Sequence, residues 1–154
     1  MTTMTNCQLI FCEKASRCAP VVRRELANKA VRIVETRSLA GCEAAIAESP
    51  ESLVVIEATA SNLTSVVDFL VRLRDSFPQA AAVTVPVVDS ATYDSVKLEL
   101  LLAEAGAIGV FRSLLDAPAI ARMAERKFQA SPASDVSLQE FVAARLPWPT
   151  HTTP

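Results

Sequence analysis

Short apolar runs alternate along the chain with longer segments of helical period. Runs rich in valine, isoleucine and leucine predict five strands, over 8–12, 31–35, 53–57, 82–89 and 107–111. The last three runs are almost continuously apolar, as expected of strands buried on both faces of a parallel sheet. Pro86 lies inside the fourth run and cannot donate a ladder hydrogen bond, so we expect only the PVVD segment to be paired.

Between these runs, apolar residues recur every three or four positions and predict helices. The expected helices follow Pro20, Ser38, Ser61 or Asn62, then span 93–104, and finally follow Asp116. Five strand–helix alternations predict the α/β class, with a doubly wound, five-stranded parallel sheet and helices on both of its faces.

One domain accounts for residues 1–128, and composition changes after Phe128. We interpret residues 129–154 as a linker and tail with a short helix over 137–146, which opens on a capping-box pattern. Phe141 and Trp148 are the side chains in this tail that we expect to anchor it on a protein surface.

Composition narrows the range of functions. The 154 residues include 15 basic and 17 acidic side chains spread along the chain, which predicts no basic face for nucleic acid. No apolar run is long enough to cross a membrane, and the N-terminus lacks the features of an export signal, so we expect a cytoplasmic protein with reduced thiols. Three scattered glycines and one histidine, His151, argue against a nucleotide loop, a histidine-assisted nucleophile and a cofactor.

Two segments carry a family resemblance. EAGAIGVFRSLLDAPAIARMAERK (104–127) resembles the receiver segment in which an Ala-Gly-Ala turn leads into the fifth strand and then the fifth helix. ESLVVIEATA (51–60) resembles the third receiver strand, which ends at the phosphorylated aspartate. Over residues 6–128 the chain is therefore similar to response-regulator receiver domains. The resemblance implies a flavodoxin-like (βα)5 fold of strand order 2-1-3-4-5, with its site at the carboxyl ends of the strands.

The chain departs from the receiver pattern at the chemical positions. The resemblance assigns the phosphosite to Cys12, Glu13, Glu57, Ser90, Arg112 and Ser113, with Asp89 as an alternative to Ser90. Only one carboxylate of the magnesium-binding pair remains, at Glu13, and the phospho-acceptor is Glu57. Serine replaces the lysine that assists phosphoryl transfer. Glu13 and Glu57 are therefore weak magnesium candidates, and we expect the phosphosite to be degenerate.

These departures predict a receiver-like module that binds proteins without phosphorylation and is not an enzyme. Glu57 invites a further hypothesis, that it mimics a phosphorylated aspartate. One alternative is a phosphate-handling enzyme in which Cys12 is the nucleophile, with Lys14 and Arg17 nearby. A second alternative is weak magnesium-dependent phosphorylation of an unorthodox carboxylate.

The helix over 93–104 is more apolar than one buried stripe requires. Val96, Leu100 and Ala103 share one face, and further leucines lie around its sides. The resemblance implies that this helix, the fifth strand and the fifth helix form a partner or homodimer surface. The candidate interface residues are Leu98, Leu101, Leu102, Phe111, Phe141 and Trp148.

Overall fold

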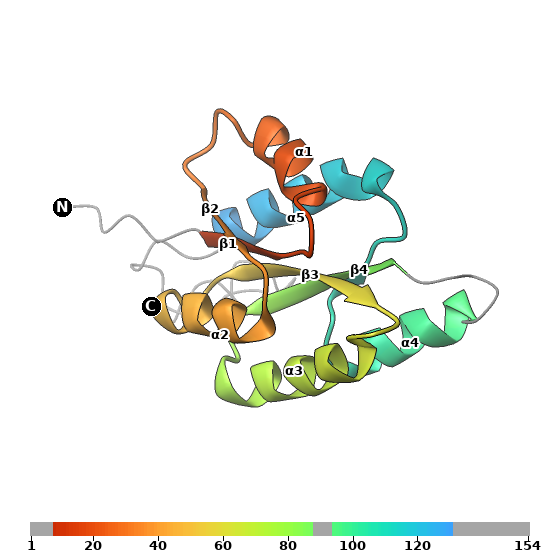
Figure 1. The fold of residues 1–154 in the computed structure, drawn as a ribbon. Coiled ribbons are helices and arrows are strands. Elements are labelled where there is room, and N and C mark those ends of the chain that lie inside the picture. Colours follow the sequence, from red (N-terminus) through yellow and green to blue (C-terminus); the bar gives the residue numbers. More distant parts are fainter. Residues whose placement is uncertain (1–7, 88–93, 131–154) are drawn as a thin grey trace, which may run out of the picture.

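The computed structural model describes residues 8–87 and 94–130, in which strands and helices alternate (Figure 1). The strands are β1 (Gln8–Cys12), β2 (Arg32–Thr36), β3 (Leu53–Thr59), β4 (Ala81–Val87) and β5 (Gly109–Val110). They form one parallel sheet in the order β2-β1-β3-β4-β5. The predicted fold class and strand order are confirmed.

Helices cover both faces of this sheet (Figure 1). They are α1 (Cys18–Glu25), α2 (Leu39–Glu48), α3 (Leu63–Ser76), α4 (Ser95–Ala105) and α5 (Ala117–Ala130), with a short 3-10 helix η1 (Leu114–Asp116). Helices α1 and α5 lie on one face, and α2, α3 and α4 lie on the other. None of these helices is long and apolar enough to span a bilayer.

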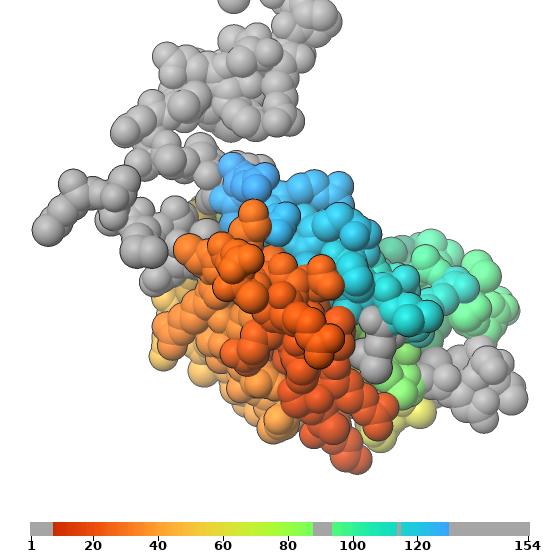
Figure 2. Space-filling model, turned by 90° about the horizontal axis from the view of Figure 1, so that it is seen from above, coloured from red at the N-terminus to blue at the C-terminus, as the bar shows by residue number. Residues whose placement is uncertain are grey.

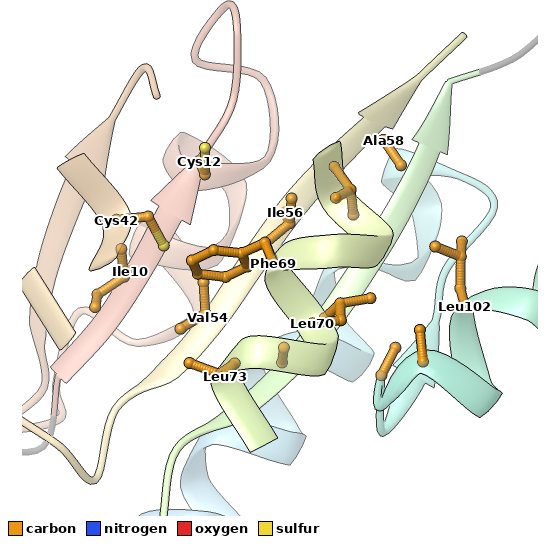
Figure 3. Packing of buried hydrophobic residues seen from close by; sticks show 14 of the residues in the cluster. Ile10, Cys12, Cys42, Val54, Ile56, Ala58, Phe69, Leu70, Leu73 and Leu102 are labelled. Carbon is orange, nitrogen blue, oxygen red and sulfur yellow. The ribbon is translucent and has the colours of Figure 1, made fainter. Parts of the chain in front are cut away.

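Each face of the sheet has its own hydrophobic core. On the α2–α3–α4 side, Phe69 of α3 lies over Val54 and Ile56 of β3 (Figure 3). On the α1–α5 side, Phe11 of β1 belongs to a cluster with Ile120 of α5. Alternate residues of the central strands enter opposite cores, which explains why their sequences are almost continuously apolar.

The expectation that Pro86 marks the start of the fourth strand is wrong. Strand β4 begins at Ala81, and Pro86 pairs with Ala58 near its end. The carbonyls of Ala82 and Thr84 accept hydrogen bonds from the β5 side of the sheet. Backbone alternation turns Pro86 toward that side too, beyond the end of the two-residue β5. Its missing N–H therefore leaves no ladder partner unsatisfied.

Two helices also differ from expectation. Helix α1 begins at Cys18, so Pro20 lies in its first turn, where a missing N–H costs little. In α4, Leu98 and Leu102 are buried in the core instead of being available to a partner. Val96 and Leu100 are exposed, at 67 % and 57 %. The expectation that Leu98 and Leu102 belong to an interface is wrong in this conformation, because their side chains fill the space between α4 and the sheet.

Several expectations lie outside the described residues. These are Ser90 with its alternative Asp89, the tail helix over 137–146, and its two aromatic anchors, Phe141 and Trp148. They stay predictions. Helix α5 continues to Ala130, two residues past the expected end of the domain.

Strand β4 contains a buried hydroxyl, on Thr84, that has no hydrogen-bond partner among the described residues. We predict that Thr84→Val raises the free energy of unfolding by about 1 kcal/mol, because a methyl group avoids the cost of burying an unpaired hydroxyl. Urea denaturation measures this change.

The matched control for this experiment is Thr36→Val. The Thr36 hydroxyl donates to the carbonyl oxygen of Phe11 at 3.2 Å, so the same substitution there should destabilise the protein. Destabilisation by both substitutions would show that the Thr84 hydroxyl is satisfied in the folded protein.

Candidate functional site

A hollow of about 280 Å³ opens at the carboxyl ends of the strands, where the receiver resemblance predicts the site. It is lined by Glu13, Arg17, Glu57, Val85, Pro86, Val87, Arg112 and Ser113. The fold thus brings together four of the predicted site residues from three separate segments. Cys12 ends β1 beside this hollow but is buried in the core on the α2–α3–α4 side.

The Glu13 carboxylate is bound by the backbone of its own chain. Its Oε1 accepts a hydrogen bond from the Cys18 amide at 2.7 Å, and its Oε2 accepts one from the Ala19 amide at 3.2 Å. These amides belong to the first turn of α1, whose N-cap residue Arg17 makes no side-chain cap. Glu13 therefore neutralises the positive end of the helix, and only 5 % of the residue remains exposed.

Glu57 extends from β3 into the hollow and is half-buried. The turn that follows it is closed by Asn62. The Asn62 side chain accepts from the Thr59 amide at 2.6 Å and donates to the Glu57 carbonyl at 3.1 Å. Asn62 is the N-cap residue of α3, one of the two expected helix starts, but its side chain makes no cap hydrogen bond and instead fixes the backbone that carries Glu57. No hydrogen bond to the Glu57 carboxylate is found within the described parts of the chain.

The positive charge nearest the predicted lysine position is already paired. The Arg112 guanidinium forms an ion pair and hydrogen bond with Glu99 of α4. Ser113 carries no charge, and its hydroxyl accepts from the Leu115 amide at 3.1 Å, which caps η1. Both groups thus serve the local structure between β5 and α5. Neither repeats the function of a free lysine ammonium in the hollow.

The described cysteines are free thiols and all three are buried. Burial raises the pKa of the Cys12 thiol, a hydrogen bond with Thr36 opposes this, and the Glu57 and Glu13 carboxylates raise it further. Burial and Glu13 raise the pKa of Cys18 to about 11. A nucleophilic cysteine needs the opposite environment, one that stabilises the thiolate.

The described residues that line the hollow include two carboxylates, Glu13 and Glu57. No group of three or more histidine, cysteine, aspartate or glutamate side chains able to hold an ion occurs in residues 8–87 and 94–130. Magnesium requires several oxygen ligands in octahedral array, and both Glu13 oxygens already accept amide hydrogens. Glu57 is the remaining carboxylate in the hollow.

Two residues have a larger part in the site than the sequence indicated. Arg17 was considered only as a neighbour of Cys12, yet it lines the hollow opposite β3 and β4. Asn62 closes the turn after Glu57. The signal for Asn62 was its position just after an apolar strand, where Asn side chains often bond nearby backbone groups.

Neither the known family models nor the curated proteins match this sequence. Solved structures do match its fold. A response regulator from Thermotoga maritima is 12 % identical, with a TM-score of 0.61, and the match covers 80 % of this chain and 98 % of that one. The CheY-like protein TadZ from Pseudomonas aeruginosa PAO1 is 19 % identical, with a TM-score of 0.61 and coverages of 78 % and 98 %.

A third solved structure belongs to an atypical orphan response regulator with a phosphorylation-independent regulatory mechanism. It is 17 % identical to this chain, with a TM-score of 0.59, and the match covers 80 % of this chain and 96 % of that one. At such identities the likeness concerns the backbone and not the chemistry of the site. The chain has the fold of response-regulator receiver domains.

Proposed function

We propose that this chain is a protein-interaction module of receiver fold that works without phosphorylation of its central carboxylate. The observation that carries this proposal is the state of Glu13. A receiver phosphosite needs carboxylates free to hold magnesium, which neutralises charge during phosphoryl transfer. Here the one carboxylate retained after β1 is bound by two helix amides.

The other parts of the hollow support the same proposal. Glu57 places its carboxylate one methylene further from the backbone than aspartate would. The cation beside the predicted lysine position, Arg112, is paired with Glu99. Magnesium-dependent phosphorylation of Glu57 would therefore lack a second free carboxylate among the described residues, and Arg112 would have to leave Glu99 to serve as the cation. The orphan regulator described above provides a precedent on the same fold for regulation without phosphorylation.

A partner surface is suggested by the distribution of exposed apolar side chains. Seven large hydrophobic residues are exposed in the part of the chain that the structure describes, and five of them fall within residues 96–115. We call these five the apolar surface: Val96, Leu100, Leu101, Ile108 and Leu115. They lie on α4 and on both sides of β5 along the chain. Leu115 is 88 % exposed, so its side chain packs against little of the described chain.

Clustered exposed apolar residues commonly mark protein-binding sites. Leu101 keeps the interface assignment made from the sequence, and the half-buried Phe111 lies nearby in the chain, just after β5. Val96 and Leu100 take the place of the buried Leu98 and Leu102. A second copy of the chain is the first partner to test.

We predict that magnesium with acetyl phosphate or beryllofluoride gives no adduct by intact mass and no change in melting temperature. In the same assay, Glu13→Ala should lower the free energy of unfolding by about 1–2 kcal/mol, with or without magnesium, because α1 loses its cap. Glu57→Gln is the matched control and should change stability little.

A magnesium-dependent adduct on the wild-type protein, absent from Glu57→Gln, would contradict the proposal. So would stabilisation by magnesium that disappears in Glu13→Ala, because a ligand that binds only the folded state raises its melting temperature.

The Cys12 enzyme alternative predicts a reactive thiol, whereas we expect a slow one. In a Cys7→Ser variant at pH 7, iodoacetamide should label the native protein more than about tenfold slower than the urea-unfolded protein, because thiolate is scarce and access is blocked. Since the pKa of Cys12 is raised, labelling should accelerate as the pH rises above 9. Intact mass follows the reaction. Rapid, selective labelling of Cys12 at pH 7 would favour the enzyme.

We predict that the apolar surface supports self-association that survives high salt. Val96→Glu with Leu100→Glu should weaken dimerisation at least about tenfold in sedimentation equilibrium at roughly 0.5 M salt, because charges enter a desolvated contact. Ala47→Glu, on the exposed face of α2, is the control and should have no effect. A wild-type protein that stays monomeric under these conditions would exclude the second copy as the partner.

A further inference from the structure

Charge is unevenly distributed between the two helical layers. Between residues 14 and 37 there are seven basic side chains and two acidic ones, although the whole chain is nearly neutral. We call these seven the basic surface: Lys14, Arg17, Arg23, Arg24, Lys29, Arg32 and Arg37. All seven are exposed. Figure 2 looks onto α1 and shows this stretch, from red to orange, as a continuous part of the surface.

The opposite layer is net acidic. Helices α2 and α3 carry four acidic side chains and two basic ones, Arg72 and Arg74. Three of the four acidic side chains are exposed, and we call Glu48, Asp68 and Asp75 the acidic surface. Helices α2 and α3 lie across the sheet from α1 (Figure 1). The acidic surface and the part of the basic surface on α1 therefore lie on opposite faces of the sheet.

Little of the basic surface is neutralised inside the molecule. Arg23 pairs with Glu35 at 3.2 Å, and Arg37 donates to the carbonyl oxygen of Glu13 at 3.1 Å. The other five members form no ion pair within the two described stretches of the chain. Of the two acidic residues within this stretch, Glu35 is the partner of Arg23, and Glu25 is exposed beside Arg24 without an ion pair in the described residues. Repulsion among these cations would therefore be relieved further by solvent ions or by an acidic partner.

We propose that the basic surface of one copy binds the acidic surface of a second copy. The chain itself carries the complementary charge, and the contact would neutralise both surfaces. Because the surfaces lie on opposite sides of the sheet, the contact joins different patches of the two copies and repeats head to tail. The acidic surface lies on α2 and α3, which leaves the apolar surface on α4 and beside β5 free. The inference thus goes beyond the proposed function and does not depend on it.

The test is sedimentation velocity of the full chain at roughly 20 mM and 300 mM salt, which differ severalfold in screening length. The sedimentation coefficient should rise more steeply with protein concentration at low salt than at high salt, where only association through the apolar surface remains. Arg24→Glu with Arg32→Glu should abolish the salt-dependent part of this rise, and so should Asp68→Lys with Asp75→Lys. Mixing the two double variants should restore the salt-dependent association. The intact acidic surface of the first then meets the intact basic surface of the second, and their two reversed surfaces are also opposite in charge.

The matched control is Lys97→Glu, which reverses an exposed cation on α4 outside both surfaces and should leave association intact. Circular dichroism checks that each variant is folded, and all the substituted residues are exposed. A single monomeric species at low salt over the whole concentration range would overturn the proposal. So would association that is equally strong at both salt concentrations and unchanged by both charge reversals, because the apolar surface alone would then explain it. Binding of heparin without self-association would also overturn it, in favour of a polyanionic partner.

Discussion

The hydrogen bonds between the Glu13 carboxylate and the first turn of α1 hold this helix and also occupy the carboxylate that a receiver phosphosite would use. They join the end of β1 to the start of the helix that crosses to β2, at the switch point of the sheet. A carboxylate at a helix N-terminus is favoured by the helix dipole as well as by its hydrogen bonds. A metal ion at this point would have to compete with both amides for the same oxygens. Local stability and phosphosite chemistry thus require the same side chain.

Two other groups that line the hollow have structural partners, and a third contact holds the turn beside it. Arg112 is paired with Glu99, the Ser113 hydroxyl caps η1, and Asn62 fixes the turn after Glu57. Each contact stabilises a described segment at the carboxyl edge of the sheet. In a domain that switches by phosphorylation, the corresponding groups must be free to change partners. A switch of that kind would therefore have to break these contacts first.

The apolar runs predicted the strands because two-sided burial leaves them nearly unbroken, and Val54 and Ile56 enter one core while Leu53 and Val55 enter the other. The order of the strands was predicted from the receiver resemblance. The sequence did not predict how Pro86 is accommodated, because that depends on the shortness of β5, a property of the neighbouring strand. Positions in the hollow were predicted from the resemblance, but the partners of Glu13 and Arg112 were not. Side-chain pairing depends on distances that spacing along the chain does not encode.

Helix α4 carries two apolar stripes, and its sequence alone is compatible with either of them facing the sheet. Leu98, Leu102 and Ala105 form one apolar stripe, and Val96, Leu100 and Ala103 form another, so periodicity alone does not decide which stripe faces the sheet. Packing decides it, because the buried stripe has leucine where the other has valine and so fills more of the space that it shares with Leu70. The second stripe is left exposed to water. It is the part of α4 that the proposed partner would cover.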